Sequence, residues 1–232
     1  MAVLKTQAYG VPKYIGGGSL IHKSFVLTLA TKFANEVAAD LTARIGEFDF
    51  TSTSESFQHL DIKIRKIIIH EHFEHANARP NNIALLQLEK AVELDYHINL
   101  ICLPPPNVKF DNKTCVATSW GKSRLTEPEE KFPSILKKSE MPVHEKAVCD
   151  EAYSNTNPPI KGLIPGVICA GGGERDTCEG HGGSPLACVG DNGAIFQIGI
   201  AAWGLGCKKP EAPIAYTEVS HYVDWINENT GF

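Results

Sequence analysis

The stretch DTCEGHGGSPLAC at Asp176–Cys188 decides how the 232-residue sequence is interpreted, and cysteines frame it. The seven cysteines of the chain are Cys102, Cys115, Cys149, Cys169, Cys178, Cys188 and Cys207. No CxxC pair is present to anchor a tetrahedral zinc site, so the sequence indicates disulfides in a secreted protein. Because the count is odd, at least one thiol is free or is bonded to something outside this chain.

Composition and charge exclude two classes of protein. The chain is 43% hydrophobic and carries a net charge of −5 at pH 7, so there is no basic footprint for nucleic acid. No apolar run approaches the ~20 residues that cross a bilayer, and the first residues lack the basic start and apolar stretch of a signal peptide. We expect neither nucleic acid nor a membrane among the partners.

Short β-like runs separated by turn residues recur along the chain. Examples are Ser24–Leu29, Leu60–Ile69, Ile83–Leu88 and Ile195–Ala201. Two stretches are predicted to be helical, Val143–Ser154 and the terminal Val219–Glu228. Many strands with a terminal helix predict a sandwich or barrel protein, and the proline-rich Cys102–Asn112 is a natural crossover between two halves.

The segment Asp176–Cys188 resembles the nucleophile loop of the trypsin/chymotrypsin family, in which the pattern is C-x-G-D-S-G-G-P-L-x-C. Other family landmarks follow in order over nearly the whole chain, among them Gly17-Gly18-Ser19, Cys102-Leu103-Pro104 and Ala202-Trp203-Gly204. The resemblance implies an all-β fold of two six-stranded antiparallel β-barrels, at about 1–104 and about 113–218, with a C-terminal helix at about 219–229. All of 1–232 would form one protease-homologue domain.

The same resemblance implies a disulfide pattern. It would join Cys115 to Cys188, Cys149 to Cys169 and Cys178 to Cys207. Cys102 occupies the position where family members bond a cysteine upstream of the catalytic domain, so we expect it to pair outside this chain; the alternative is a buried free thiol. The family bridge beside the catalytic histidine is missing at both ends, where Gly16 and Lys32 stand.

The resemblance also places the catalytic positions, and none carries a catalytic side chain. Peptide hydrolysis in this family needs a hydroxyl nucleophile, an imidazole base and a carboxylate that orients the imidazole. Thr31 stands at the histidine position, Asn82 at the aspartate position and Gly182 at the serine position. We therefore expect no catalytic residues, no protease activity and no cofactor.

The supporting parts of the site are altered too. His181 replaces the aspartate that pairs with the new α-amino group after activation cleavage. The resemblance places the specificity pocket at Asp176, Ala202, Trp203, Gly204 and Ile214. Asp176 survives at its base, but Ile214 replaces a family glycine on its wall, so we expect the side chain of Ile214 to fill the pocket and leave Asp176 vestigial.

Three further features allow a functional or a structural interpretation. His70, His72 and His75 could ligate zinc or copper, with His70 and His72 on one strand face, or could form an exposed loop. Glu47 and Glu55 lie where some relatives bind calcium, but the pattern between them is poor, so we predict no metal site. The sequon Asn112-Lys113-Thr114 predicts glycosylation at Asn112. His144 and His221, on predicted helices, are interpreted as ordinary residues.

Within the family, Gly182 followed by Gly-Ser-Pro-Leu resembles the clip-domain serine protease homologues of arthropods, as does the run His97–Asn107. Such proteins carry an upstream clip domain, which would lie outside this chain, and are secreted into haemolymph as non-catalytic cofactors in melanization. That subgroup commonly keeps His and Asp, whereas this chain has all three positions replaced. The expected partners are a protease, a protease zymogen or prophenoloxidase.

Two alternative functions remain open from the sequence. One is a decoy that occupies protease inhibitors or substrates, which requires an open pocket at Asp176. The other is a metal-binding protein, or a residual or novel enzyme, that uses the cluster His70–His75. The sequence leaves the oligomeric state undetermined.

Overall fold

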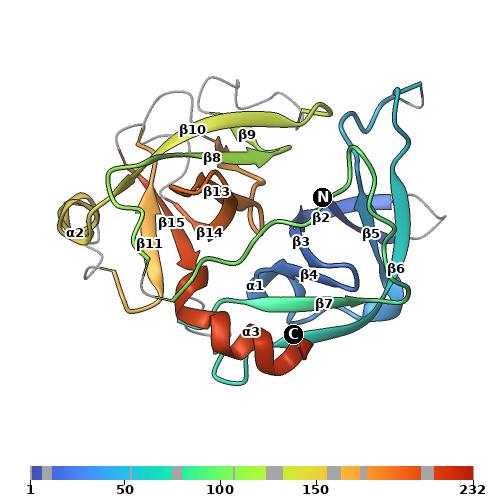
Figure 1. Cartoon of the computed structure of the whole chain (residues 1–232), viewed down its shortest axis with the longest axis horizontal. Coiled ribbons are helices and arrows are strands. Elements are labelled where there is room, and N and C mark those ends of the chain that lie inside the picture. Colours follow the sequence, from blue (N-terminus) through green and yellow to red (C-terminus); the bar gives the residue numbers. More distant parts are fainter. Residues whose placement is uncertain are drawn as a thin grey trace.

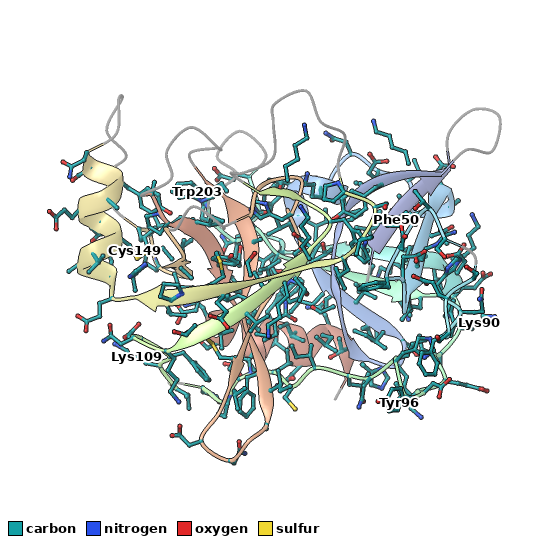
Figure 2. All side chains as sticks on the ribbon, turned by 90° about the horizontal axis from the view of Figure 1, so that it is seen from above. Phe50, Lys90, Tyr96, Lys109, Cys149 and Trp203 are labelled. Carbon is teal, nitrogen blue, oxygen red and sulfur yellow. A yellow bond between two sulfur atoms is a disulfide. The ribbon has the colours of Figure 1, made fainter. Side chains whose placement is uncertain are left out.

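A computed structural model describes residues 2–6, 12–52, 54–74, 80–106, 108–123, 133–155, 163–172, 177–204 and 212–231. Figure 1 shows two β-structured halves side by side, joined by the segment that follows β7, with the C-terminal helix lying beneath the first half. Side chains fill the interior of both halves (Figure 2). This is the expected all-β, trypsin-like fold with a C-terminal helix.

The first half is a seven-stranded antiparallel sheet with the order β2-β1-β5-β6-β7-β4-β3. Its strands are β1 (Ala2–Thr6), β2 (Pro12–Gly17), β3 (Ser19–His22), β4 (Phe25–Thr28), β5 (Leu41–Ile45), β6 (Leu60–Ile69) and β7 (Ala84–Leu88). The two edge strands, β2 and β3, are separated in the chain by Gly18 alone. The covalent chain, rather than a hydrogen-bonded ladder, therefore joins the two edges of this barrel, and β2 with β3 corresponds to one of the six expected strands.

The second half is a closed six-stranded barrel with the order β10-β11-β15-β14-β13-β8. Its strands are β8 (Thr114–Ser119), β10 (Lys137–His144), β11 (Val167–Ala170), β13 (Pro185–Val189), β14 (Ile195–Trp203) and β15 (Ile214–Glu218). The disulfide between Cys115 and Cys188 joins the paired strands β8 and β13. Beside the barrel, β9 (Lys122–Ser123) pairs with β12 (Thr177–Glu179).

The helices correct two sequence predictions at their first residues. The described helices and 3-10 turns are α1 (Ala30–Phe33), η2 (Ala38–Asp40), α2 (Lys146–Ser154), η4 (Val219–Tyr222) and α3 (Val223–Thr230). Val143 and His144, predicted to be helical, complete β10, because both pair with β11. The terminal segment begins as the 3-10 turn η4 before α3. Nowhere in the described ranges is a helix both long and apolar enough to span a bilayer.

Candidate functional site

The seam between the two barrels brings the first two of the three expected catalytic positions into direct contact. Thr31 lies in the single turn of α1, directly after β4, and Asn82 lies two residues before β7. The backbone N–H of Thr31 donates a hydrogen bond to Oδ1 of Asn82 at 2.9 Å. β4 and β7 are paired antiparallel, so the end of one strand meets the start of the other.

Asn82 is a buried structural anchor. Its side chain accepts from α1, and its backbone carbonyl accepts from Oγ1 of Thr217 on β15 at 3.0 Å. One residue thus connects α1, β7 and the second barrel. A neutral amide can accept a backbone hydrogen bond as a carboxylate does, but it supplies no negative charge to hold an imidazolium.

Gly182, the third position, lies against Lys32. A Cβ atom built on Gly182 would lie 2.6 Å from Cε and 3.4 Å from Nζ of Lys32, with Cδ1 of Leu29 at 3.8 Å. The carbonyl of Gly182 accepts the N–H of Gly17 at 3.0 Å, which fixes this loop on β2. The side chain of Lys32 therefore occupies the space in which a nucleophile carried by residue 182 would begin.

The path of Lys32 follows from the missing family disulfide. A Cβ atom built on Gly16 would lie 3.5 Å from Cγ of Lys32 and 2.8 Å from the carbonyl oxygen of Gly182. With glycine at both neighbouring positions, the aliphatic part of the lysine runs past Gly16 toward Gly182. The sequence carried the signal, a small residue opposite a long one at the lost cysteine pair, but our sequence analysis assigned Lys32 no role.

Hydroxyl groups near the seam lie inside the protein. Oγ1 of Thr28 donates to the carbonyl of Gly17 at 2.8 Å, and Ser184 is buried. A Cβ atom built on Gly17 would lie 2.5 Å from Oγ of Ser184. Such packing leaves no room for a substrate carbonyl at Ser184. Thr31 itself has a hydroxyl that does not accept a proton near neutral pH, so it supplies no general base.

His181 is buried in the loop that precedes Gly182. Its backbone carbonyl accepts the N–H of Ser184 at 2.9 Å, which closes a turn around the two intervening glycines. Gly183 has a φ of 89°, and its N–H donates to the carbonyl of Ala201 on β14 at 3.0 Å. Backbone hydrogen bonds to the second barrel therefore hold this loop.

Ile214, expected on one wall of the specificity pocket, is a core residue that faces Gly204 on the other expected wall. Ile214 begins β15, is only 2% exposed, and belongs to the core of the second barrel. Its Cγ1 would lie 3.7 Å from a Cβ atom built on Gly204, so a side chain at position 204 would touch Ile214. Ala202 and Trp203 are partly buried beside them. Asp176 lies outside the described residues.

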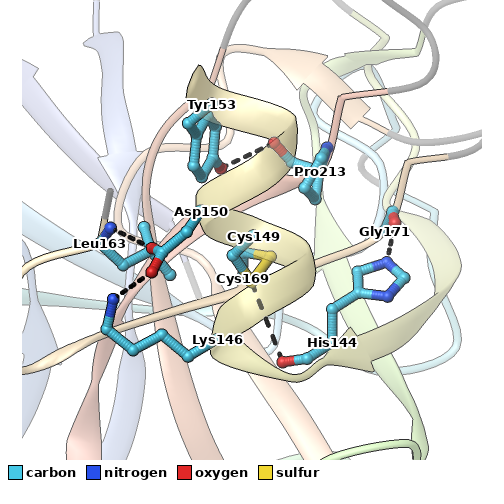
Figure 3. Close-up of a disulfide and its surroundings, with 9 residues drawn as sticks. All are labelled: His144, Lys146, Cys149, Asp150, Tyr153, Leu163, Cys169, Gly171 and Pro213. Atoms are coloured by element: carbon cyan, nitrogen blue, oxygen red, sulfur yellow. Dashed lines mark hydrogen bonds and ion pairs between the residues drawn. A yellow bond between two sulfur atoms is a disulfide. The ribbon is translucent and has the colours of Figure 1, made fainter. Parts of the chain in front are cut away.

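Helix α2 contacts both expected walls through Tyr153, whose hydrogen bond to Pro213 is drawn in Figure 3. The phenol of Tyr153 donates to the carbonyl of Pro213 at 2.9 Å, and its ring lies 4.8 Å from that of Trp203. Burial raises the pKa of Tyr153, so the group remains a neutral donor. The disulfide between Cys149 and Cys169 fastens the same helix to β11. Tyr153 is a supporting residue that the sequence analysis did not single out.

His70, in the 70–75 histidine cluster, packs against neighbouring side chains. The expectation that His70 and His72 share a strand face is wrong, because β6 ends at Ile69 and a turn follows. The N–H of His72 points to Nδ1 of His70 at 3.2 Å, and the His70 ring packs 5.1 Å from Trp225. His75 lies outside the described residues. Across the part of the chain that is described, no group of three His, Cys, Asp or Glu side chains could hold a metal ion.

The two carboxylates of the calcium-like loop already have partners. The buried side chain of Glu47 lies 3.1 Å from Nδ1 of His59 and 3.3 Å from a guanidinium nitrogen of Arg44. Oε1 of Glu55 accepts the N–H of Asp49 at 2.7 Å. Oε2 of Glu47 is therefore already engaged by Arg44 and His59.

Cys102 is exposed and forms no disulfide within the described residues, so the buried-thiol alternative is wrong. Its N–H donates to Ile195 at 3.2 Å and its carbonyl accepts the N–H of Gln197 at 2.9 Å, which fixes its backbone on β14. Cys178 lies on β12, and Cys207, with which it is expected to form a bridge, lies outside the described residues. His144, expected on a helix, instead lies on β10 with Nε2 2.6 Å from the carbonyl of Gly171.

Comparisons with known proteins agree with this geometry. The family model described as trypsin matches residues 1–226. The chain is 40% identical over 218 residues to "Inactive CLIP domain-containing serine protease A8" of Anopheles gambiae, covering 92% of this chain and 58% of that protein. It is 37% identical over 220 residues to "Phenoloxidase-activating factor 2" of Galleria mellonella, covering 93% of this chain and 71% of that protein.

A third relative, "Inactive CLIP domain-containing serine protease A28" of Anopheles gambiae, is 38% identical over 229 residues, covering 97% of this chain. The chain spans 58% of the length of this relative, as it does of the first. Two of the three relatives are thus named as inactive proteases, and the matched region is the one that contains Thr31, Asn82 and Gly182.

Proposed function

Because the chain belongs to the trypsin family, we propose that it is a non-catalytic member that acts as a secreted protein-binding cofactor or adaptor in an extracellular immune protease cascade. The cascade class is the one that activates prophenoloxidase in melanization, and the partner is a protease, its zymogen or prophenoloxidase. The names of the relatives support this class. The observation that carries the proposal is the side chain of Lys32 in front of Gly182.

Loss of catalysis follows from the atoms at the seam. A triad enzyme forms a bond from a side-chain oxygen to the substrate carbonyl while an imidazole removes the proton. Residue 182 has no side chain, Thr31 has no basic nitrogen, and Asn82 carries no charge. Removing triad members from a protease costs several powers of ten in rate. Here the occupied space adds a steric obstacle to the missing chemistry.

Three features fit an extracellular protein with an upstream partner domain. Cys102 presents an exposed sulfur on a fixed backbone, which suits a disulfide to a cysteine upstream of this chain. Two disulfides already link elements of the second barrel. Asn112 of the sequon is exposed in a turn with a φ of 64°, and its Nδ2 lies 3.0 Å from Glu145, so a glycan there would project into solvent.

The proposal is tested by reconstitution. Purified prophenoloxidase and its activating protease are mixed with and without this protein, and phenoloxidase activity is followed. We expect activity to rise with added protein, while the protein alone cleaves no peptide substrate and takes no label from a fluorophosphonate probe. Peptide turnover that persists after contaminating hydrolases are blocked would contradict the proposal. So would the absence of binding to every component of the mixture.

A further inference from the structure

The outer surface of the first barrel carries an aromatic patch that is separate from the expected catalytic positions at the seam. We call it the Tyr96 shelf; its members are Phe57, Leu60, Leu94, Tyr96 and His97. Tyr96 is 88% exposed and Phe57 is 44% exposed, although both are large apolar rings. Figure 2 shows Tyr96 at the outer edge of that barrel, away from the junction of the two halves. Contiguous exposed apolar patches mark interaction sites more often than scattered apolar residues do.

The shelf is held in one conformation by local contacts. Asp95 and Ile98 exchange two backbone hydrogen bonds, at 2.9 and 3.1 Å, so Tyr96 and His97 form the tip of a tight turn. Phe57 stacks on Tyr96 at 5.4 Å and on His97 at 5.0 Å. A partner that binds rings already stacked in this way loses little conformational entropy in ordering them.

His97 joins the two loops that form the shelf. Its Nε2 lies 3.0 Å from the carbonyl of Gln58, which ties the 93–98 turn to the loop that carries Phe57. Behind the ring, a Cβ atom built on Gly46 would lie 2.7 Å from the His97 side chain, and Gly46 has a φ of 79°. Only glycine fits there without strain, so the close approach of Gly46 allows His97 to support the stack.

A cavity of about 410 Å³ opens beside the shelf, and it is lined by more carboxylates than basic groups. Among the described residues that line it are the two carboxylates Glu93 and Asp95 and the imidazole of His97, whose Nδ1 lies 3.8 Å from Asp95, with no Lys or Arg. Glu93 is exposed, and the side chain of Asp95 is 67% exposed. Aromatic faces beside carboxylates attract a cation twice, through the ring quadrupole and through opposite charge.

We propose that the Tyr96 shelf docks a partner protein through an exposed loop in which a Lys or Arg side chain stands beside an apolar one. The inference rests on the proposed protein-binding function and names the surface for it. The apolar side chain packs on Phe57 and Tyr96, and the cation reaches Glu93 and Asp95. Aromatic residues in rigid, partly enclosed positions are the residues that dominate interface energies.

Two fluorescent heptapeptides test the shelf directly by anisotropy. One is acetyl-Gly-Leu-Arg-Phe-Lys-Leu-Gly-amide, and its matched control carries Glu in place of Arg and Lys. We expect the basic peptide to bind at least tenfold more tightly than the acidic one, with an affinity that falls as salt rises. Absence of binding by the basic peptide, or equal binding of both peptides, would overturn the proposal.

Matched variants locate the site. Tyr96→Ala should weaken binding of the basic peptide about tenfold. The double variant Glu93→Gln with Asp95→Asn removes the two negative charges and should therefore flatten the dependence of binding on salt. The amide that replaces the carboxylate of Asp95 can still accept the N–H of Tyr96, so the turn should be kept. Val189→Ala, on a residue 61% exposed on the second barrel, is the control and should change nothing. Equal effects of Tyr96→Ala and Val189→Ala would overturn the assignment, as would a dimer of the wild-type chain that Tyr96→Ala dissolves.

The reconstitution assay separates this inference from the proposed function. If wild-type protein raises phenoloxidase activity and Tyr96→Ala does so equally, the shelf is overturned and the cofactor role stands. If the wild-type protein has no effect in the assay while the peptide results hold, the cofactor role fails and the shelf stands as a binding surface for basic segments.

Discussion

Lys32 lies across the position that a side chain at Gly182 would occupy, with its Cε 2.6 Å from the built Cβ atom. Real Cβ atoms do not approach a carbon so closely, so one of the two side chains would have to move. The observed course of Lys32 therefore depends on the absence of a side chain at position 182. Restoring a serine would not by itself restore the space around it.

The variant Gly182→Ser should be less stable than the wild-type chain. Overpacking costs about 1–3 kcal/mol in the free energy of unfolding. The loss here should lie at the low end of that range, because the clashing atom is the far end of a flexible, half-buried lysine side chain that can shift. Adding Lys32→Ala should recover most of that loss, because the clashing methylene is removed. Urea denaturation of the wild-type, both single variants and the double variant gives the coupling energy between the two sites.

Additive effects of the two substitutions would contradict this prediction, since they would show that the side chains do not compete for space. Neither serine variant should take a fluorophosphonate label, because Thr31 and Asn82 supply no base. Lys32→Ala alone is the control for the loss of the lysine itself.

Ile214 should be a large contributor to stability where the family pattern leaves open space. Ile214→Ala is expected to cost about 2–5 kcal/mol, the usual range when a buried isoleucine is truncated. Ile195→Ala is the matched control, because Ile195 is 53% exposed on β14, and it should cost under about 0.5 kcal/mol. Similar midpoints of thermal unfolding for the two variants would contradict the assignment of Ile214 to the core.

The sulfur of Cys102 should react readily in the folded chain. Because the residue is exposed and forms no disulfide within the described part of the protein, a thiol reagent such as dithionitrobenzoate should modify it without denaturant. Cys102→Ser should lower the yield by one equivalent per chain. An unchanged yield would show that Cys102 is protected. In the longer protein, loss of this reactivity and a cross-linked peptide under non-reducing conditions would locate its expected partner.

Stability should decline on the acid side through His70. Burial lowers the pKa of its imidazole, against the opposing charge of Glu71 and with small contributions from His72 and His221. The folded state therefore favours the neutral ring that packs on Trp225. This contribution is complete above about pH 6.5, the value in unfolded chains, and is lost as the pH falls toward the lowered pKa of the folded state.

Comparing the midpoints of urea denaturation at pH 7.5 and 5.5 measures the contribution of neutral His70 to stability. His70→Gln should show a smaller loss between the two values than the wild-type chain does. His72→Gln, at an exposed turn position nearby, should behave as the wild type. Identical losses in all three proteins would show that His70 does not titrate between its folded and unfolded values.

Local pattern predicted several individual strands, whereas the arrangement in two barrels was implied by the family resemblance. The alternation along Leu60–Ile69 predicted β6 with the bounds that the structure has, and it breaks at Arg65–Lys66, where the register with β7 shifts. The same reasoning was wrong at Val143 and His144, because a pair of residues cannot show whether apolar spacing belongs to a strand or to the helix that follows. Pairing with β11, which is distant in sequence, decides it.

The site divides in the same way. The residue types at Thr31, Asn82 and Gly182 could be assigned from motif order, since each follows or precedes a recognisable strand. The position of Lys32 could not, because a side chain of four rotatable methylenes takes the path that its neighbours leave open. That path depends on Gly16 and Gly182, which are far apart in the sequence and meet only in the folded protein.

The hydrogen bond from Thr31 to Asn82 has a consequence for how this protein responds to its surroundings. An amide keeps the same charge at every physiological acidity, and so do a hydroxyl and a glycine. None of these three positions changes its protonation when the surrounding solution becomes more acidic. These three positions are therefore insensitive to acidity, whereas His70, at its contact with Trp225 of the C-terminal helix, responds to it.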